Sequence, residues 1–123
     1  MTYIIIALKL VIAVSIVNVW LFRSRKSSPW RGGDATNMKQ EFESYGFPLS
    51  FMYLIGTLKV SLALLLIGSF WVPSLTIPAA TGIGVLMLGA VLAHFYIKDR
   101  AFKSLPAASF MVASLIILAY TAF

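Results

Sequence analysis

Four long apolar segments, separated by polar ones, run over residues 3–22, 50–71, 75–97 and 105–123. As a helix rising about 1.5 Å per residue, each is long enough to cross a hydrocarbon core about 30 Å thick. A bilayer offers no water to backbone amides, so segments of this kind must be helical. The pattern therefore predicts an all-α membrane protein built as one domain, a bundle of four transmembrane helices.

Composition agrees with a chain that uses lipid as its solvent. Of the 123 residues, 60% are hydrophobic and only 11% are charged, whereas about 25% are charged in an ordinary soluble domain. The chain has no cysteine, which excludes disulfides, thiol redox centres and thiolate metal sites. Its net charge is +6, but the basic residues flank the apolar segments. Anionic lipid headgroups, not nucleic acid, are therefore the predicted partner.

The connection over residues 23–49 is the one with room for structure outside the membrane. Within it, residues 36–45 are predicted to form a short amphipathic helix at the membrane interface. Met38, Phe42 and Tyr45 share one side of that helix and would face the bilayer or the bundle.

Basic residues predict the orientation of the chain. Outside the four spans, every Lys and Arg lies in the first or the third connection: Arg23, Arg25, Lys26, Arg31, Lys39, Lys98, Arg100 and Lys103. By the positive-inside rule, these two connections face the cytoplasm and both termini lie outside. The expected location is a bacterial inner membrane.

Ionisable side chains inside a membrane are costly and are the first candidates for a functional site. Lys59 lies near the middle of the second span, on the same helix face as Gly56 and Ala63. Small residues typically line helix contacts, so Lys59 is predicted to point into the bundle. It would be neutral, bonded to backbone carbonyls or Asn18, or paired with an anionic or carbonyl-bearing ligand.

Three further side chains are weaker candidates for binding a ligand. Lys9 lies close enough to the outer end of its helix for its stem to lift the ammonium to the interface. His94, near the cytoplasmic end of the third span, is the sole histidine. It suits a hydrogen-bonded contact or a ligand contact, and no metal site is predicted. Asn18 belongs to a small polar stripe on the first helix.

The segment Arg31, Gly32 and Gly33 offers a guanidinium followed by backbone amides. Such a combination can contact a lipid phosphate. No Asp or Glu lies inside a span, and no nucleophile–base pair or pair of carboxylates is visible in the sequence. No catalytic residue is therefore predicted.

Short motifs are spread over nearly the whole chain. They are Arg31-Gly32-Gly33-Asp34-Ala35-Thr36-Asn37-Met38 followed by Glu41-Phe42, Gly56-x-x-Lys59 through Gly68, Trp71 and Pro73, then Pro78-Ala79-Ala80, Met87-x-Gly89-Ala90 and His94. Together with four short helices, they resemble the small bacterial DoxX-like membrane proteins. These motifs specify the family without specifying a reaction.

This resemblance implies a role in the cell but not a particular reaction. The family is named for a subunit associated with a thiosulfate:quinone oxidoreductase, and other relatives are linked to quinone stress or thiol-redox complexes. Distant eukaryotic relatives act as assembly chaperones for receptors. The implied function is a non-catalytic accessory or scaffold subunit of a membrane complex, with partner subunits or further copies of the chain. No cofactor is implied within the chain, while a quinone is a candidate ligand.

Two other functions stay open. The first is a binder or permease for a quinone-like, lipid-like or anionic compound, with its site at Lys59. The second is an enzyme of quinone or lipid metabolism. A redox centre belonging to this chain alone is not expected, because it has no cysteine and a single histidine.

Overall fold

Helices account for most of the structure. The computed structural model describes residues 2–22, 31, 33, 35–99 and 101–122. Within these residues, four helices are long and apolar enough to cross a membrane. They are α1 (Thr2–Val17, continued by π-helical turns over Asn18–Phe22), α3 (Leu49–Gly68), α4 (Thr76–Tyr96, after a 3-10 turn over Pro73–Leu75) and α5 (Leu105–Ala122, after a 3-10 turn over Ala101–Ser104). The predicted all-α fold with four membrane-length helices is confirmed.

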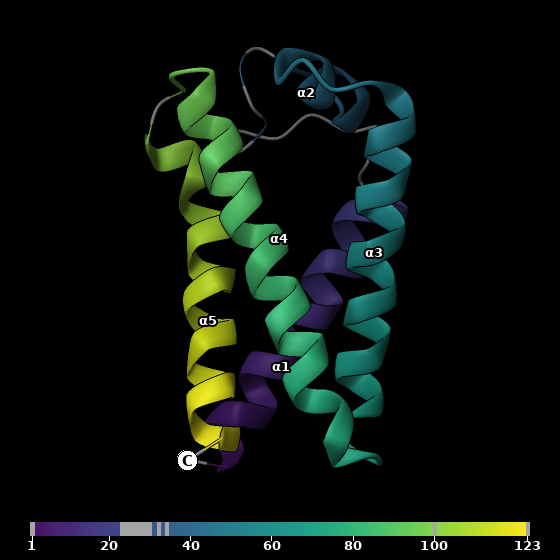
Figure 1. Ribbon diagram of the computed structural model, residues 1–123, viewed down its shortest axis with the longest axis vertical. Coiled ribbons are helices and arrows are strands. Elements are labelled where there is room, and N and C mark those ends of the chain that lie inside the picture. Colours follow the sequence, from purple (N-terminus) through teal and green to yellow (C-terminus); the bar gives the residue numbers. More distant parts are fainter. Residues whose placement is uncertain (1, 23–30, 32, 34, 100, 123) are drawn as a thin grey trace.

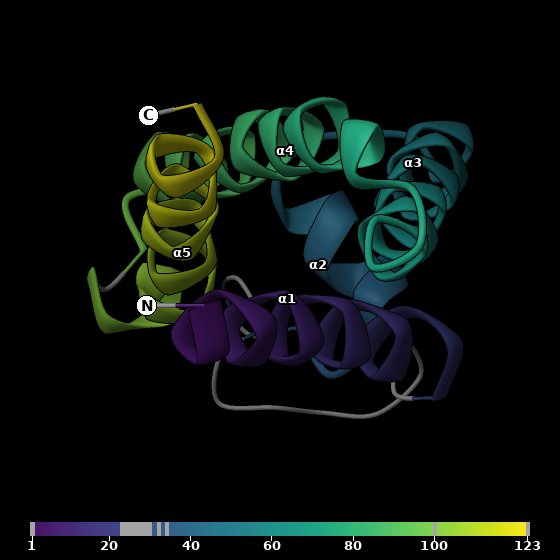
Figure 2. The ribbon, with the colours of Figure 1, turned by 90° about the horizontal axis from the view of Figure 1, so that it is seen from below.

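The four long helices form a ring (Figure 2). In it, α1 packs against α3 and α5, and α4 packs against the same two helices from the other side. The α4 helix crosses obliquely, so that it begins beside α3 and ends beside α5, against which it packs most extensively (Figure 1). This crossing separates α3 from α4 at the end of the ring where α2 lies.

The short helix α2 (Met38–Ser44) has well-defined ends. The side chain of Asn37 accepts a hydrogen bond of 2.8 Å from the backbone N–H of Gln40, which is a standard N-terminal cap. After the helix, Gly46 has a φ of +83°, a left-handed conformation that suits glycine. The predicted helix between the first two spans is therefore present, and Asn37 starts it.

The apolar side of α2 faces the bundle. Met38, Phe42 and Tyr45 are 5%, 8% and 7% exposed, and Phe42 makes an edge-on ring contact with Trp20 at 5.9 Å. Figure 1 shows α2 lying across one end of the ring. Of the two environments predicted for this face, the structure shows the bundle interior.

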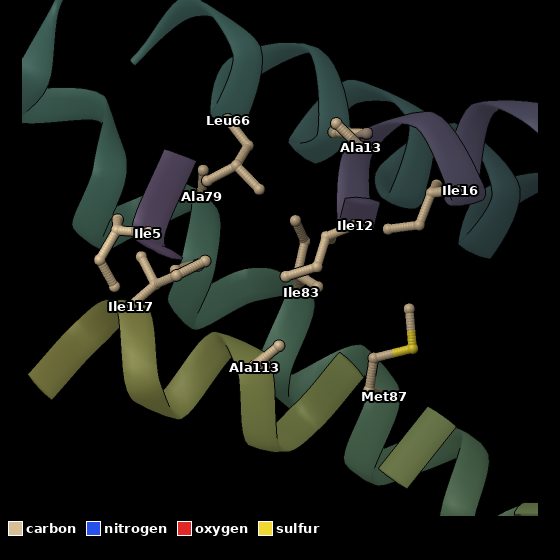
Figure 3. Close-up of a cluster of buried hydrophobic side chains, with 12 residues drawn as sticks. Ile5, Ile12, Ala13, Ile16, Leu66, Ala79, Ile83, Met87, Ala113 and Ile117 are labelled. Atoms are coloured by element: carbon tan, nitrogen blue, oxygen red, sulfur yellow. The ribbon is translucent and has the colours of Figure 1, made fainter. Parts of the chain in front are cut away.

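A close-packed core fills the half of the ring away from α2. Isoleucine side chains of α1, α4 and α5 meet alanines there, which let the helix backbones approach one another (Figure 3). Its members are Ile5, Ile12, Ala13, Ile16, Ala63, Leu66, Ala79, Ala80, Ile83, Met87, Ala113 and Ile117. The other half of the ring contains a cavity.

Candidate functional site: a cavity beneath α2

A cavity of about 370 Å³ lies between the helices in the half of the bundle nearest α2. Its walls come from the end of α1, the first half of α3, the second half of α4 and the beginning of α5. Most of the lining is apolar, with Ile16, Val19, Ile55, Leu86, Met87 and Phe110 among its members. Its volume lies within the range of about 300–1,000 Å³ typical of pockets for small molecules.

Lys59 lies on the wall of this cavity, where it meets Trp20. Its Nζ atom is 5.5 Å from the centroid of the Trp20 ring, a cation–π distance. Gly56, one turn earlier on α3, makes this arrangement possible. A Cβ atom at Gly56 would lie 2.6 Å from Cε3 and Cζ3 of Trp20, so any larger residue would displace the ring.

The Lys59 ammonium forms no ion pair in the part of the chain that the structure describes, and the Glu41 carboxylate attracts it only from a greater distance. The ion pairs there involve Arg31, His94 and Lys103 with Glu41 and Asp99, and none involves Lys59. An ammonium has three hydrogen-bond donors. In an apolar cavity these donors favour a ligand that carries a carbonyl or an anionic group.

A chain of polar side chains forms the end of the cavity nearest α2. Arg31 and Glu41 form an ion pair of 3.1 Å, and the Tyr45 hydroxyl donates to the other Glu41 oxygen at 2.8 Å. The Tyr45 oxygen also lies 3.2 Å from His94 Nε2. Burial and the neighbouring Glu41 raise the pKa of Tyr45, so its hydroxyl keeps its proton. Helices α2 and α4 are thereby connected.

This chain of polar side chains continues beyond the end of α4. His94 Nδ1 lies 2.9 Å from Asp99 Oδ2, which also accepts a 3.0 Å hydrogen bond from the Gly33 N–H. Lys103 lies 3.7 Å from Asp99 Oδ1 and donates to the Gly33 carbonyl. Burial alone would raise the pKa of Asp99, but the His94 and Gly33 hydrogen bonds and the Lys103 charge lower it. Asp99 is therefore a carboxylate.

A turn at the end of α4 brings Asp99 back to His94. Lys98 has a φ of +56°, and the Asp99 N–H donates to the His94 carbonyl at 2.9 Å. This is the hydrogen bond that closes a helix through a left-handed residue, a position usually taken by glycine. The lysine at this position therefore carries backbone strain of about 1 kcal/mol or more.

The hydrogen-bond donors and acceptors in this chain of polar side chains constrain one another. Tyr45 has one hydroxyl proton, and donating it to Glu41 leaves its oxygen as an acceptor for His94 Nε2. The Asp99 carboxylate can only accept, so His94 Nδ1 must donate to it. The Nδ1 donor of His94 and the Lys103 ammonium thus lie beside the single carboxylate of Asp99.

Some of the site residues predicted from the sequence line the cavity, and others do not. Lys59, His94 and Arg31 all line the cavity, although they are far apart in the sequence. Asn18 is exposed and does not line it, so Lys59 faces Trp20 and not Asn18. Lys9 lies at the opposite end of the bundle, where it donates to Ser69 and Thr76.

Arg31 and Gly33, predicted as phosphate contacts, are directed at carboxylates of the chain itself. Arg31 is 6% exposed and binds Glu41, and the Gly33 amide donates to Asp99. Gly32 lies outside the described residues. Among the described residues, no group of three or more His, Asp or Glu side chains could hold a metal ion.

Five residues of the site were not predicted from the sequence: Trp20, Glu41, Tyr45, Asp99 and Lys103. Two short spacings in the sequence indicate part of this arrangement. Glu41 and Tyr45 are four residues apart and therefore neighbours on one helix face. His94 and Asp99 are joined across a helix end, a pairing that depends on the left-handed Lys98.

The fold and the cavity define a multi-pass helical membrane protein with an internal pocket closed at one end by a short helix. Residues 30–118 match the family model of the DoxX-like family, and the chain belongs to this family. The match includes α2, α3, α4 and most of α5, and hence all the side chains of the polar chain. The family predicted from the sequence motifs is confirmed. No curated protein and no solved structure matches the chain.

Proposed function

We propose that this chain is a non-catalytic membrane protein that binds a lipophilic, quinone-like molecule in the cavity beneath α2. The observation that carries the proposal is the Lys59 ammonium on the wall of an apolar cavity of about 370 Å³, where it forms no ion pair with a carboxylate among the described residues. A flat ring with carbonyl groups matches both features, because its body is apolar and its oxygens accept hydrogen bonds.

The polar chain under α2 supports binding more than catalysis. Arg31, Glu41, Tyr45, His94 and Asp99 are bonded to one another. Groups engaged in this way position a wall of the cavity and are not held ready for a substrate. A quinone could still accept a hydrogen bond from Lys59 without disturbing them.

The family supports the place of such a binder in the cell. Its members resemble accessory subunits of quinone-linked membrane complexes, and a subunit of that kind would hold the quinone for a partner. We place the chain in a bacterial inner membrane with α2 on the cytoplasmic side. Partner subunits or further copies of the chain would then pack on the lipid-facing surfaces of the ring.

The test uses the full-length protein in mild detergent and ubiquinone-1 as the probe. Quinones quench tryptophan fluorescence, and Trp20 lines the cavity, so titration with the probe reports binding. Lys59→Met removes the amine and keeps most of the stem. We expect its affinity for the probe to be about tenfold weaker, the effect of losing one hydrogen bond from a charged donor.

The matched control is Lys39→Met, which removes an equal charge from an exposed position on α2. It should bind the probe as the wild type does. Thermal unfolding of both variants checks that the fold is kept. Equal affinities of wild type and Lys59→Met would overturn the proposal, as would a wild type that shows no saturable quenching.

A further inference from the structure

Lys9 marks a second polar site at the end of the bundle opposite to α2. The side chain leaves α1 and reaches the turn between α3 and α4. There Nζ donates to Ser69 Oγ at 3.0 Å and to Thr76 Oγ1 at 3.2 Å, and it lies 5.2 Å from the centroid of the Phe70 ring. Lys9, Ser69 and Thr76 are all at least nine-tenths buried. The contacts hold the ammonium at the level of the turn.

The charge of this ammonium is not balanced within the described part of the chain. Both of its hydrogen-bond acceptors are neutral hydroxyls, and the ion pairs described all lie at the α2 end. In the sequence, the four acidic residues are Asp34, Glu41, Glu43 and Asp99, all of them in the first and third connections. A buried cation next to neutral groups alone is unfavourable unless an anion joins it. One of its three N–H donors is also still available.

An open hollow lies directly beside this ammonium. Its lining includes Lys9, Phe70, Pro73 and Thr76 together with Thr2, Tyr120 and Thr121. Thr2 Oγ1 and the Tyr120 hydroxyl lie 3.0 Å apart at its exposed rim. Its lining comes from the start of α1, the turn between α3 and α4, and the end of α5, and these segments lie at the end of the bundle opposite to α2 (Figure 1). An ammonium bonded to two hydroxyls, beside an open hollow that is lined by further hydroxyls, has the chemistry of a phosphate site.

We infer that this hollow binds a phosphate group, held by the Lys9 ammonium and by the hydroxyls of Thr76 and Tyr120. The phosphate comes from the headgroup of an anionic membrane lipid or from free inorganic phosphate. The site lies at the other end of the bundle from the cavity, so the inference does not rest on the proposed binding of a quinone-like molecule.

Thermal unfolding of the full-length protein in detergent tests the inference with three probes. They are inorganic phosphate, short-chain phosphatidylglycerol, and a diacylglycerol with the same chains but no phosphate. Binding to the folded state raises the melting temperature, because it stabilises that state by RT ln(1 + L/Kd), where L is the free ligand concentration. We expect a rise with a phosphate-bearing probe and none with the diacylglycerol. A response to inorganic phosphate identifies the free ion as sufficient, and a response to phosphatidylglycerol alone identifies the lipid headgroup.

Variants assign the effect to Lys9. Lys9→Met should lose the stabilisation, whereas Lys39→Met, which removes the same charge at the α2 end, should keep it. Should Lys9→Met fail to fold, Tyr120→Phe decides, because Tyr120 is 44% exposed and its loss does not disturb the core. Its affinity for the phosphate probe should fall about tenfold. Unchanged affinity in the variant that folds, or no response of the wild type to either phosphate probe, overturns the inference.

Discussion

At the scale of single residues, the contact between Gly56 and Trp20 decides where the Lys59 ammonium lies. The Trp20 ring occupies the space that a side chain at Gly56 would take, and Lys59 lies over that ring. The sequence marks Gly56 as a small residue on the helix face of Lys59, but it does not show that Trp20 packs against it. The glycine nevertheless acts on the site, because it sets how closely α1 approaches α3.

Gly56→Ala should therefore disturb both the fold and the site. The added Cβ would lie 2.6 Å from two atoms of the Trp20 ring, so the ring must move. Overpacking of this kind costs about 1–3 kcal/mol of the free energy of unfolding. Unfolding in detergent, followed by tryptophan fluorescence, measures the loss. The control is Gly89→Ala, whose Cβ would meet no atom within 4 Å. Equal stabilities of the two variants would contradict the close contact.

At the scale of elements, the helix ends hold α2 on the bundle. The turn after α4 aims Asp99 at His94, and Asp99 in turn binds the Gly33 amide that precedes α2. Lys103, from the turn before α5, joins the same group. The position of α2 over the cavity thus depends on local structure at the junction of α4 and α5.

The left-handed residue in this turn gives a prediction on stability. Lys98 is exposed and has a φ of +56°, so replacing it with glycine removes strain without removing a buried contact. Lys98→Gly should raise the free energy of unfolding by about 1 kcal/mol. Lys98→Ala is the matched control, since alanine keeps the Cβ atom and with it the strain. A gain in both variants would point to the loss of charge as the cause.

The Asp99 carboxylate predicts a dependence of stability on pH. Its pKa in the folded protein lies below the ordinary value of 3.8. A depressed folded pKa contributes stability that is present above the unfolded value and is lost as the pH falls through the folded value. The melting temperature of the wild type should therefore fall more steeply below about pH 4 than that of Asp99→Asn.

Thermal unfolding over a series of acidic buffers measures this difference. Asp99→Asn should also be less stable than the wild type at neutral pH, because His94 and Lys103 lose the carboxylate that both of them contact. Glu43→Gln, at an exposed position of α2, serves as the control and should keep the acid response of the wild type. Parallel curves for wild type and Asp99→Asn would show that Asp99 does not carry the effect.

At the scale of the whole molecule, the bundle has a close-packed half and a hollow half. The core of isoleucines and alanines fills the half in which α1 begins and α5 ends (Figures 1 and 3). The oblique path of α4 opens the other half, which α2 then covers. The cavity is thus bounded at one end by the close-packed core and at the other by α2, which side-chain contacts hold on the bundle.

The distribution of basic residues predicts the orientation of this bundle in the membrane. A reporter active only in the cytoplasm, fused after Phe123, should give little signal because the C-terminus is predicted to lie outside. The same reporter fused to a chain that ends at Ser104, in the third connection, should give a strong signal. A strong signal after Phe123 and a weak one after Ser104 would reverse the orientation.

The sequence alone determined the class of protein, the four helices, the short helix α2 and the family. These features are local: a bilayer requires every long apolar segment to satisfy its backbone hydrogen bonds within itself. The apolar side of α2 could also be read from the spacing of Met38, Phe42 and Tyr45, because the opposite side of that helix is polar.

Only the tertiary structure decided what faces the cavity. The long helices are apolar on all sides, so periodicity does not distinguish a face that packs from a face that meets lipid. The meeting of Lys59 with Trp20, and of Tyr45 with His94, depends on the crossing angles of helices far apart in the sequence. Those angles follow from side-chain volumes at every contact, such as the missing Cβ of Gly56, and volumes act only once the helices are packed together.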